Sequence, residues 1–481
     1  MTAAPITGPP PTPPAAGGRR RLPPNRRNSE LLLMLFAGLL VAWFAVGAHF
    51  ALLQSAGAAA LVMPAMFVFL AVGGHATVRY FAPYADPVIL PCVTFLNGLG
   101  VVFIARLDLG DADPEERQTL ATFGDYGFRQ LLWTLVAVVA FVLVLALVRD
   151  HRTLSTYAYT LALIGIVLVA IPAVLPYSLS GSGGSKLWIH TPVGSIQPGE
   201  FAKLLLLSFF AYYLVRKREV LSLASKRVLG IDFPRGRDLG PVIVVWVASL
   251  LVLVFERDLG TSLMYFGSFV AMTYIATERT SWLLIGLGLF LGGALLAYSL
   301  FSHLQIRVSV WLDPFQDPDG IGYQPIQALF GLGTGGLFGT GPGVGAADTI
   351  PVGHSDYIAA GIGEEIGLFG LSAVLVLYLV IVERGIRTAL LVRDSFGKLL
   401  AAGLAFSLGL QVFVIVGGVS KLIPLTGLTT PFLSYGGSSL VANWILAALL
   451  LRISDAARRP ADSSPPPAGR LSMAQTEVVR L

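Results

Sequence analysis

Twelve long apolar runs constrain this chain more than any other feature. Each has the length, roughly 20 residues, that an α-helix needs to cross a hydrocarbon core about 30 Å thick. Because the runs are uniformly apolar rather than alternating, and because backbone polar groups must be satisfied within lipid, the sequence predicts an all-α, multi-pass membrane bundle. The runs cover residues 31–53, 57–78, 88–105, 131–148, 154–176, 200–215, 239–255, 259–277, 281–300, 360–382, 399–419 and 435–451.

The two ends of the chain have a different composition. Residues 1–30 are rich in Pro and Arg, and residues 456–481 contain a run of three prolines, so both segments are predicted to be disordered. The first apolar run begins too late and is too long for an ordinary cleaved signal peptide. We therefore divide the chain into a head (1–30), two N-terminal helices (31–87), a main membrane domain (88–455) and a tail (456–481).

The distribution of Lys and Arg predicts the orientation. Cytoplasmic connections are enriched in basic residues near membrane ends. With both termini inside, the head, the tail and the connections after even-numbered runs hold 25 of the 33 basic residues. The net charge of +5 then reflects attraction to anionic membrane lipids, which we favour over nucleic acid as the partner of the basic clusters.

Eight basic residues oppose this rule, and they indicate a polar site on the outer face. Many acidic residues accompany them there, and the longest outer connection, from His303 to about Ala359, separates the ninth and tenth runs. Loops of that length are usually functional or disordered, and this one is too aromatic and apolar for disorder. The eight residues are Arg106, Arg117, Arg129, Lys186, Lys203, Arg257, Arg307 and Lys421.

Polar residues also gather before the sixth run and between the seventh and eighth. Lys186 and Trp188 precede Gln197, and Glu200 and Lys203 then share one face of the sixth helix because they are three residues apart. This pair has two interpretations, an N-terminal salt bridge or part of a functional site, since charges within a membrane are usually functional.

The hairpin between the seventh and eighth runs contains Asp258, which could also serve only as a helix cap.

Two further outer segments combine polar residues with glycines. In the long connection, Gln324 precedes a glycine-rich stretch in which Gly331, Gly333 and Gly336 match a dinucleotide-binding pattern. That pattern needs a preceding strand, which a membrane bundle lacks, so these glycines are predicted to allow close backbone packing or close approach to a ligand. Asp356 follows near the end of the same connection. The last run is preceded by a dense hydroxyl and glycine segment that includes Ser434, Ser438 and Ser439.

Together these segments resemble the SEDS family (shape, elongation, division and sporulation), which includes RodA, FtsW and SpoVE. The matching motifs occur in family order over about residues 88–455, and the two additional N-terminal helices resemble the arrangement of actinobacterial RodA proteins. They are Lys186-Leu-Trp188-Ile, Gln197-Pro-Gly-Glu200-Phe-Ala-Lys203, Asp258-Leu-Gly-Thr261, Tyr323-Gln324, His354-Ser-Asp356-Tyr-Ile, Gly363-Glu-Glu-Ile-Gly367 and Pro424-Leu-Thr-Gly427 through Ser439.

The resemblance implies a peptidoglycan glycosyltransferase of the bacterial cytoplasmic membrane. Such an enzyme polymerises lipid II into undecaprenyl-linked glycan on the outer face of the membrane, in cell-wall elongation or division and control of cell shape. It also implies a class B penicillin-binding protein, a transpeptidase, as the partner. Two alternatives stay open at this point: a lipid II flippase and a noncatalytic scaffold for the transpeptidase.

The resemblance also assigns candidate roles to residues. Asp356 matches the catalytic aspartate of the family and would be the general base, although capping of the following helix is the alternative. Arg129 and Lys203 would contact phosphate, and Glu200 and Asp258 would orient them. No cofactor is required by any motif, but outer acidic residues could hold Mg²⁺ or Mn²⁺ beside the pyrophosphate.

Overall fold

Helices make up nearly all of the structure. The computed structural model describes residues 26–54, 59–112, 125–182, 185–191, 194–221, 224–228, 231–234 and 236–460, so most of the predicted disordered head and tail lies outside the described residues. The helices are α1 (Arg27–Leu53), α2 (Ala59–Phe81), α3 (Ile89–Asp111), α5 (Asp125–Leu147), α6 (Thr153–Thr156), α7 (Ala158–Val174), α8 (Tyr177–Ser180), α9 (Pro198–Leu221), α10 (Gly240–Glu256), α11 (Leu259–Thr277), α12 (Ser281–Leu300), α13 (Ser302–Leu312), α14 (Tyr323–Gly335), α15 (Ile358–Leu391), α16 (Ser395–Val419) and α17 (Gly437–Arg458).

Ten of the described helices are long and apolar enough to cross a membrane. They are α1, α2, α3, α5, α9, α11, α12, α15, α16 and α17. Helices α7 and α10 are also apolar but have only 17 residues each, and they occupy the two remaining predicted runs. The prediction of a multi-pass helical membrane protein is therefore confirmed.

Short antiparallel hairpins supplement the helices. Strands β1 (Gly181–Ser182) and β2 (Ser185–Lys186) pair with each other, as do β3 (Ile189–Thr191) and β4 (Gly194–Ile196). Both pairs lie in the connection that leads into α9. A third pair, β5 (Ala224–Val228) with β6 (Ile231–Pro234), connects α9 to α10.

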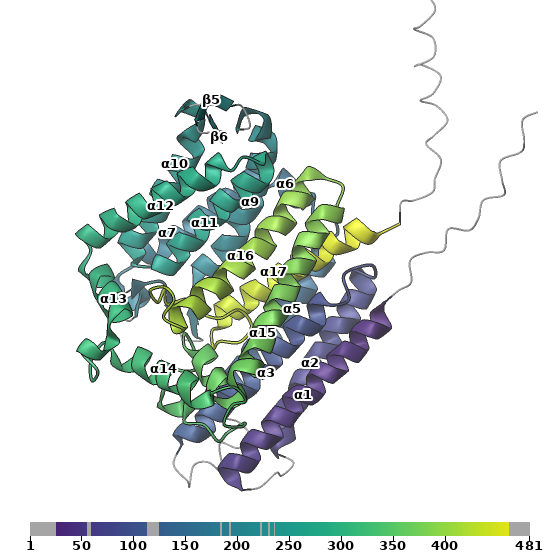
Figure 1. Cartoon of the computed structure of the whole chain (residues 1–481). Coiled ribbons are helices and arrows are strands. Elements are labelled where there is room, and N and C mark those ends of the chain that lie inside the picture. Colours follow the sequence, from purple (N-terminus) through teal and green to yellow (C-terminus); the bar gives the residue numbers. More distant parts are fainter. Residues whose placement is uncertain are drawn as a thin grey trace, which may run out of the picture.

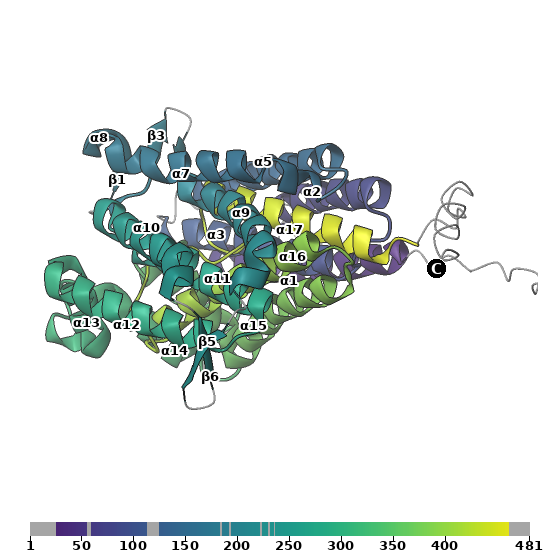
Figure 2. The same cartoon turned by 90° about the horizontal axis from the view of Figure 1, so that it is seen from above.

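Two helices form the centre of the bundle. In the most apolar 18-residue windows of α3 and α17, 94% and 83% of residues are buried, against 17% in α12. Figure 1 shows α1 and α2 along one flank and α10 and α12 along the other, and Figure 2 shows α3 and α17 between α5 and α15. The lipid-facing surface therefore belongs mainly to the flanking helices.

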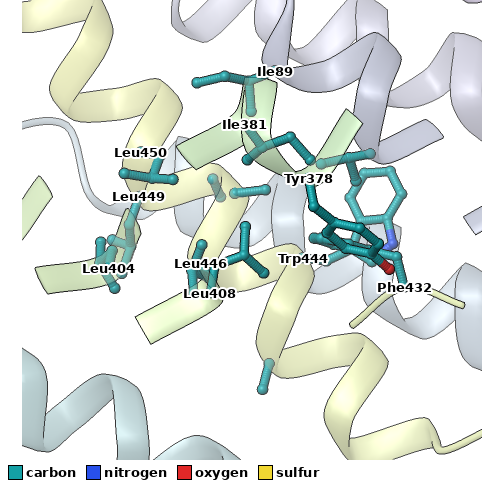
Figure 3. Close-up of a cluster of buried hydrophobic side chains, with 14 of the residues drawn as sticks. Ile89, Tyr378, Ile381, Leu404, Leu408, Phe432, Trp444, Leu446, Leu449 and Leu450 are labelled. Atoms are coloured by element: carbon teal, nitrogen blue, oxygen red, sulfur yellow. The ribbon is translucent and has the colours of Figure 1, made fainter. Parts of the chain in front are cut away.

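Aromatic side chains with satisfied polar tips hold the central helices together (Figure 3). Trp444 of α17 donates its indole N–H to Asn97 of α3 at 2.9 Å, and Phe141 packs edge-on against its ring. The hydroxyl of Tyr378 in α15 donates to the carbonyl of Pro431. Because lipid is as apolar as these side chains, the buried rings stabilise the bundle through van der Waals packing, and each hydrogen bond also fixes how the helices meet.

The long connection between α12 and α15 is largely ordered by short helices. It contains α13, α14 and the 3₁₀ turns η2 (Pro314–Gln316) and η3 (Ala347–Thr349), which explains its apolar and aromatic composition. A methyl group on Gly335 would lie 2.3 Å from the carbonyl oxygen of Gly363, and one on Gly331 would lie 3.1 Å from Glu364. Gly331 and Gly335 thus pack α14 closely against α15, as the sequence predicts for Gly331. A methyl group on Gly333 or Gly336 would meet no atom within 4 Å, so close packing does not explain those two glycines.

Helix α15 is interrupted at Gly367, whose φ of 69° is left-handed. Such a break frees backbone groups, which must find other partners. The amide of Thr340 donates to the carbonyl of Glu364 at 3.0 Å, and the amide of Leu368 donates to Gly336 at 2.9 Å. The segment after α14 therefore completes the hydrogen bonding of α15 and is joined to its first turns.

Candidate functional site

Asp356 lies in the loop that leads into α15, where the connection between α16 and α17 holds the backbone. Its carboxylate accepts a hydrogen bond from the hydroxyl of Ser355 at 2.9 Å. Ser434 donates its hydroxyl to the carbonyl of Ser355 at 2.7 Å, and the amide of Tyr435 donates to His354 at 2.8 Å. The hydroxyl and glycine segment that sequence analysis singled out thus positions the backbone that carries Asp356.

A cluster of three rings supports the same loop. His354 stacks on Tyr126 with ring centroids 4.6 Å apart, and Tyr435 meets the ring of Tyr126 edge-on at 5.2 Å. Burial lowers the pKa of His354, which keeps the imidazole neutral at pH 7. Arg129 forms a hydrogen bond with Tyr435 and an ion pair with Asp125 at 3.0 Å, and its side chain is 56% exposed. The predicted residue Arg129 therefore belongs to the rim of this cluster.

Arg307 of α13 lies beside Asp356 on the other side of Gly427. Its guanidinium donates to the carbonyl of Leu425 at 2.8 Å. A methyl group on Gly427 would lie 3.8 Å from the guanidinium nitrogens and 3.9 Å from the Asp356 carboxylate. Gly427 also has a left-handed φ of 78°, so a side chain there would be strained and would crowd both charged groups.

Asp258 contributes a second carboxylate to this region. It caps α11 by accepting the amide hydrogen of Thr261 at 2.9 Å, as the structural interpretation predicts. Its other oxygen, Oδ2, is buried and has no hydrogen-bond partner among the described residues. The positive charge of Arg307 acts on both Asp258 and Asp356. Asp258 thus caps a helix and presents an unsatisfied oxygen to the site.

Burial is the main influence on Asp356 itself. It disfavours the charged carboxylate and raises the pKa, while the hydrogen bond from Ser355 and the charge of Arg307 oppose part of that rise. A carboxyl group whose pKa is raised toward neutrality is a stronger base than an ordinary aspartate. The surroundings of Asp356 therefore favour acid–base chemistry.

Glu200 and Lys203 form the predicted pair on α9, and both are buried. The ammonium of Lys203 donates to Glu200 and to the side-chain oxygen of Gln411 in α16, each at 2.8 Å. Gln411 in turn donates to the carbonyl of Thr429 at 2.9 Å. The negative charge of Glu200 also acts on Asp258. The pair is therefore connected both to the loop before α17 and to the carboxylates of the site.

Three further predicted residues, Ser438, Ser439 and Gln324, make hydrogen bonds within the protein. The hydroxyl of Ser438 accepts the amide hydrogen of Gln197 at 2.9 Å, which fixes α17 against the start of α9. Ser439 contacts the side-chain amide of Asn443 within α17. Gln324 donates its side-chain amide to the carbonyl of Pro351 at 2.6 Å and so connects α14 to the segment before Asp356.

Lys186 and Trp188 are not brought together with Asp356 by the contacts of the described residues. The ammonium of Lys186 lies 3.2 Å from the carbonyl of Leu175, so it caps the C-terminal end of α7. The backbone amide of Trp188 donates to Ser180 at 3.3 Å. Both residues order the hairpin region that precedes α9.

Sequence analysis did not place Arg307 or Gln411 in the site. Arg307 carried a usable signal, because it is one of the eight basic residues that oppose the predicted orientation. Gln411 is a lone amide within an otherwise apolar run, and polar residues in such a position usually have a structural or functional partner.

A buried charge network stabilises the segment around η3. Arg106 of α3 forms ion pairs with Asp348 at 2.8 Å and with Glu365 of α15. Glu365 also accepts the amide hydrogen of Gly343 at 3.0 Å, and Glu364 accepts that of Ala346 at 2.9 Å. The two consecutive glutamates therefore fasten the outer segment to α15 just before its kink.

An apolar cavity of about 310 Å³ has Arg307 in its lining. Helices α10, α11, α12 and α13 line it with side chains such as Trp246, Phe266 and Phe290. Arg307 and Thr426 lie among the few polar lining residues. Arg307 thus belongs both to the wall of this apolar cavity and to the surroundings of Asp356.

Comparison with known proteins identifies the class to which this fold and site belong. Residues 87–459 match the family model of the FtsW, RodA and SpoVE proteins, described as a cell cycle protein family. The chain belongs to this family.

Among its relatives, the peptidoglycan glycosyltransferase RodA of Mycobacterium tuberculosis is 53% identical over 414 residues, which cover 86% of this chain and 87% of that protein. The stage V sporulation protein E of Bacillus subtilis is 34% identical over 69% of this chain and 90% of its own length. The high identity with mycobacterial RodA proteins confirms the prediction of an actinobacterial RodA-like member.

Solved structures have the same architecture. A chain from a peptidoglycan synthase complex, whose structure describes the coordination of polymerization and crosslinking, aligns with a TM-score of 0.57 at 25% identity and covers 77% of this chain and 97% of that one. The Thermus thermophilus rod shape determining protein RodA aligns with a TM-score of 0.52 at 23% identity over 77% of this chain and 96% of that chain. At 23% identity, the similarity to the Thermus thermophilus protein is a similarity of fold.

Proposed function

We propose that this chain, a peptidoglycan glycosyltransferase by its family, polymerises lipid II with Asp356 as the general base. The observation that carries the proposal is that Arg307 lines an apolar cavity, lies across Gly427 from Asp356, and acts through its charge on both Asp356 and Asp258. A lipid-linked sugar donor likewise combines a charged part and an apolar part, since its pyrophosphate is charged and its isoprenoid chain is apolar.

The proposed reaction needs one proton acceptor and one source of positive charge. The 4-hydroxyl of the acceptor sugar attacks the anomeric carbon of the growing chain, undecaprenyl pyrophosphate leaves, and the hydroxyl proton passes to Asp356. Arg307 lies close enough to the carboxylate to neutralise charge that develops on the leaving pyrophosphate. Lys203 and Arg129 remain proposed phosphate contacts at the edges of the site, with Glu200 and Asp258 orienting them.

A divalent cation would have few protein ligands here. Among the described residues, no group of three or more His, Cys, Asp or Glu side chains could hold a metal ion. Mg²⁺ commonly binds through one or two carboxylates together with substrate phosphates. The unsatisfied oxygen of Asp258 fits that arrangement, so a Mg²⁺ or Mn²⁺ ion arriving with the pyrophosphate would take this residue as its ligand and would add charge stabilisation.

The proposed partner is a class B penicillin-binding protein. The similar chain from a peptidoglycan synthase complex supports this proposal. Helix contacts within the membrane plus a contact outside it would provide two weak attachments that reinforce each other. Co-purification in mild detergent tests the pairing, and recovery of folded protein without a transpeptidase would contradict it.

The proposed location is the bacterial cytoplasmic membrane with both termini in the cytoplasm. Cysteines placed singly in the 216–238 connection and in the 303–359 connection, in a Cys92→Ser background, report the orientation. An impermeant thiol reagent added to intact cells should label the second site and spare the first. The reverse pattern would overturn the orientation.

Asp356→Asn tests the catalytic proposal directly. Asn caps a helix about as well as Asp but cannot accept the proton. A general base contributes roughly 10²- to 10⁴-fold in rate, so the purified variant should make glycan from lipid II at least about a hundredfold more slowly. Asp319→Asn, at an exposed acid in the same outer connection, is the matched control and should retain activity.

Each outcome separates two interpretations. A folded Asp356→Asn protein that polymerises lipid II normally would show that Asp356 only caps the helix. Absence of polymerisation by the wild-type protein, in the presence of its transpeptidase, would instead favour the noncatalytic scaffold.

A further inference from the structure

A second cavity, of about 440 Å³, lies at the other end of the bundle. Its lining comes from the start of α1, the turn between α2 and α3, and the C-terminal ends of α15 and α17. Asp356 precedes α15, whereas Arg384 is 16 residues beyond Leu368, the first residue after the break in this helix, which is about 24 Å along a helix at 1.5 Å per residue. The two cavities are therefore on opposite faces of the protein.

Positive charge dominates this second cavity. Five arginines line it against a single carboxylate, that of Asp86. Asp86 is already occupied, because it pairs with Arg458 and accepts the amide hydrogen of Val88 at 2.9 Å. The five arginines are Arg26, Arg27, Arg384, Arg387 and Arg458.

Nearby acidic residues reduce the excess of positive charge in this cavity without removing it. Glu30 pairs with Arg27, and Glu383 lies 3.1 Å from Arg384 and 4.0 Å from Arg387. Five arginines thus share three carboxylates, while the side chain of Arg387 is 57% exposed. Guanidinium groups gathered in this way suit a phosphate anion, because each can donate two parallel hydrogen bonds to its oxygens.

The surroundings of the cavity favour a phosphate that is attached to a lipid. Leu32 and Phe36 follow the arginines of α1 and are 69% and 59% exposed, and Leu390 of α15 is 78% exposed. Figure 1 shows α1 on the outer flank of the bundle, where acyl chains can run along it. Basic pockets between membrane helices are known to bind anionic headgroups.

We propose that the arginine-lined cavity formed by α1, α15, α17 and the α2–α3 turn binds the phosphate headgroup of an anionic phospholipid. Bound there, one headgroup neutralises cations of three separate helices and connects the additional helix α1 to the main domain. The site does not involve the residues of the proposed reaction and does not depend on that proposal.

The test compares lipids and matched variants of the full chain. Native mass spectrometry would follow binding of phosphatidylglycerol, phosphatidylcholine and inorganic phosphate to purified protein, with thermal unfolding as a second measurement. Arg26→Gln/Arg387→Gln removes two exposed arginines of the cavity, and Arg149→Gln/Arg393→Gln removes two exposed arginines from other connections at the same end.

Phosphatidylglycerol should bind and raise the unfolding temperature of the wild type and of the control. The cavity variant should bind it about thirtyfold more weakly. Equal binding by the cavity variant and the control would overturn the site. Equal binding of phosphatidylcholine, or equal protection by inorganic phosphate alone, would overturn its assignment to an anionic lipid. If the double variant unfolds, Arg387→Gln alone gives the same comparison.

Discussion

The two ends of the bundle differ in how their buried carboxylates are satisfied. At the α1 end, Glu30 contacts both Arg27 and His75, and Asp455 accepts the amide hydrogen of Tyr84 at 2.8 Å while it pairs with Arg459 at 2.7 Å. At the Asp356 end, Oε1 of Glu256 and Oδ2 of Asp258 are buried and have no hydrogen-bond partner among the described residues.

This difference separates stability from function. A buried polar group that is left unsatisfied destabilises the fold, so it persists mainly where a ligand completes it. We therefore expect substitutions at the Asp356 end to reduce the rate of polymerisation, and substitutions at the α1 end to reduce the free energy of unfolding.

Arg307→Gln should have the largest effect. Loss of the guanidinium should slow polymerisation by about 10²- to 10³-fold, the usual contribution of one group that stabilises transition-state charge. It should also raise the pKa of Asp356 further, because Arg307 favours the carboxylate. A general base works deprotonated, so the activity lost on acidification should be lost at a higher pH than in the wild type.

The pH dependence of kcat/KM on lipid II measures both effects. Arg307→Lys keeps the charge and is the control, with an acid limb close to that of the wild type. A slow Arg307→Gln enzyme with an unchanged acid limb would show that Arg307 does not act on the base.

Asp455→Ala should instead destabilise the fold. It removes the acceptor for the amide of Tyr84 and leaves Arg452, which is buried, without its acidic neighbour. Breaking one side of a buried pair costs about 3 kcal/mol or more. Thermal unfolding in detergent checks this, with Arg459→Ala as the control, since its partly exposed charge contributes little. Equal stability of the two variants would remove the contrast between the two ends.

Asp394→Ala should produce a smaller loss, about 1 kcal/mol, because Asp394 caps α16 by accepting the amide hydrogen of Gly397 at 2.7 Å. Burial alone would raise the pKa of Asp394, but this hydrogen bond and the contact with His151 outweigh burial and lower it. Its stabilisation is therefore present above the pKa of the unfolded chain, about 4, and is lost as the pH falls through the lower folded value. Unfolding measured between pH 7 and pH 3 should show a smaller loss on acidification in the variant, and an identical loss would contradict this assignment.

Much of the fold follows from hydrophobic length, but the site depends on contacts between distant segments. The apolar runs predict every long helix, and the motif around Asp356 indicates the loop that carries it. The position of Arg307 next to Gly427 could not be predicted from the sequence. It depends on where α13 runs in the fold, and no periodic pattern specifies that. The charge rule and the family motifs indicate Arg129 and Lys186, but their contacts with Asp125 and with the end of α7 depend on local geometry.

The break at Gly367 has a mechanical consequence. Because the amide of Thr340 bonds to the carbonyl of Glu364, and Leu368 bonds to Gly336, α14 and the first turns of α15 form one lever. The short arm of this lever ends beside Asp356, and its long arm is α14 on the surface of the protein (Figure 1). A force applied to α14 from outside the membrane would thus be transmitted to the first turns of α15 and to the loop that carries Asp356, and the ion pairs of Arg106 with Asp348 and Glu365 would carry part of it to α3.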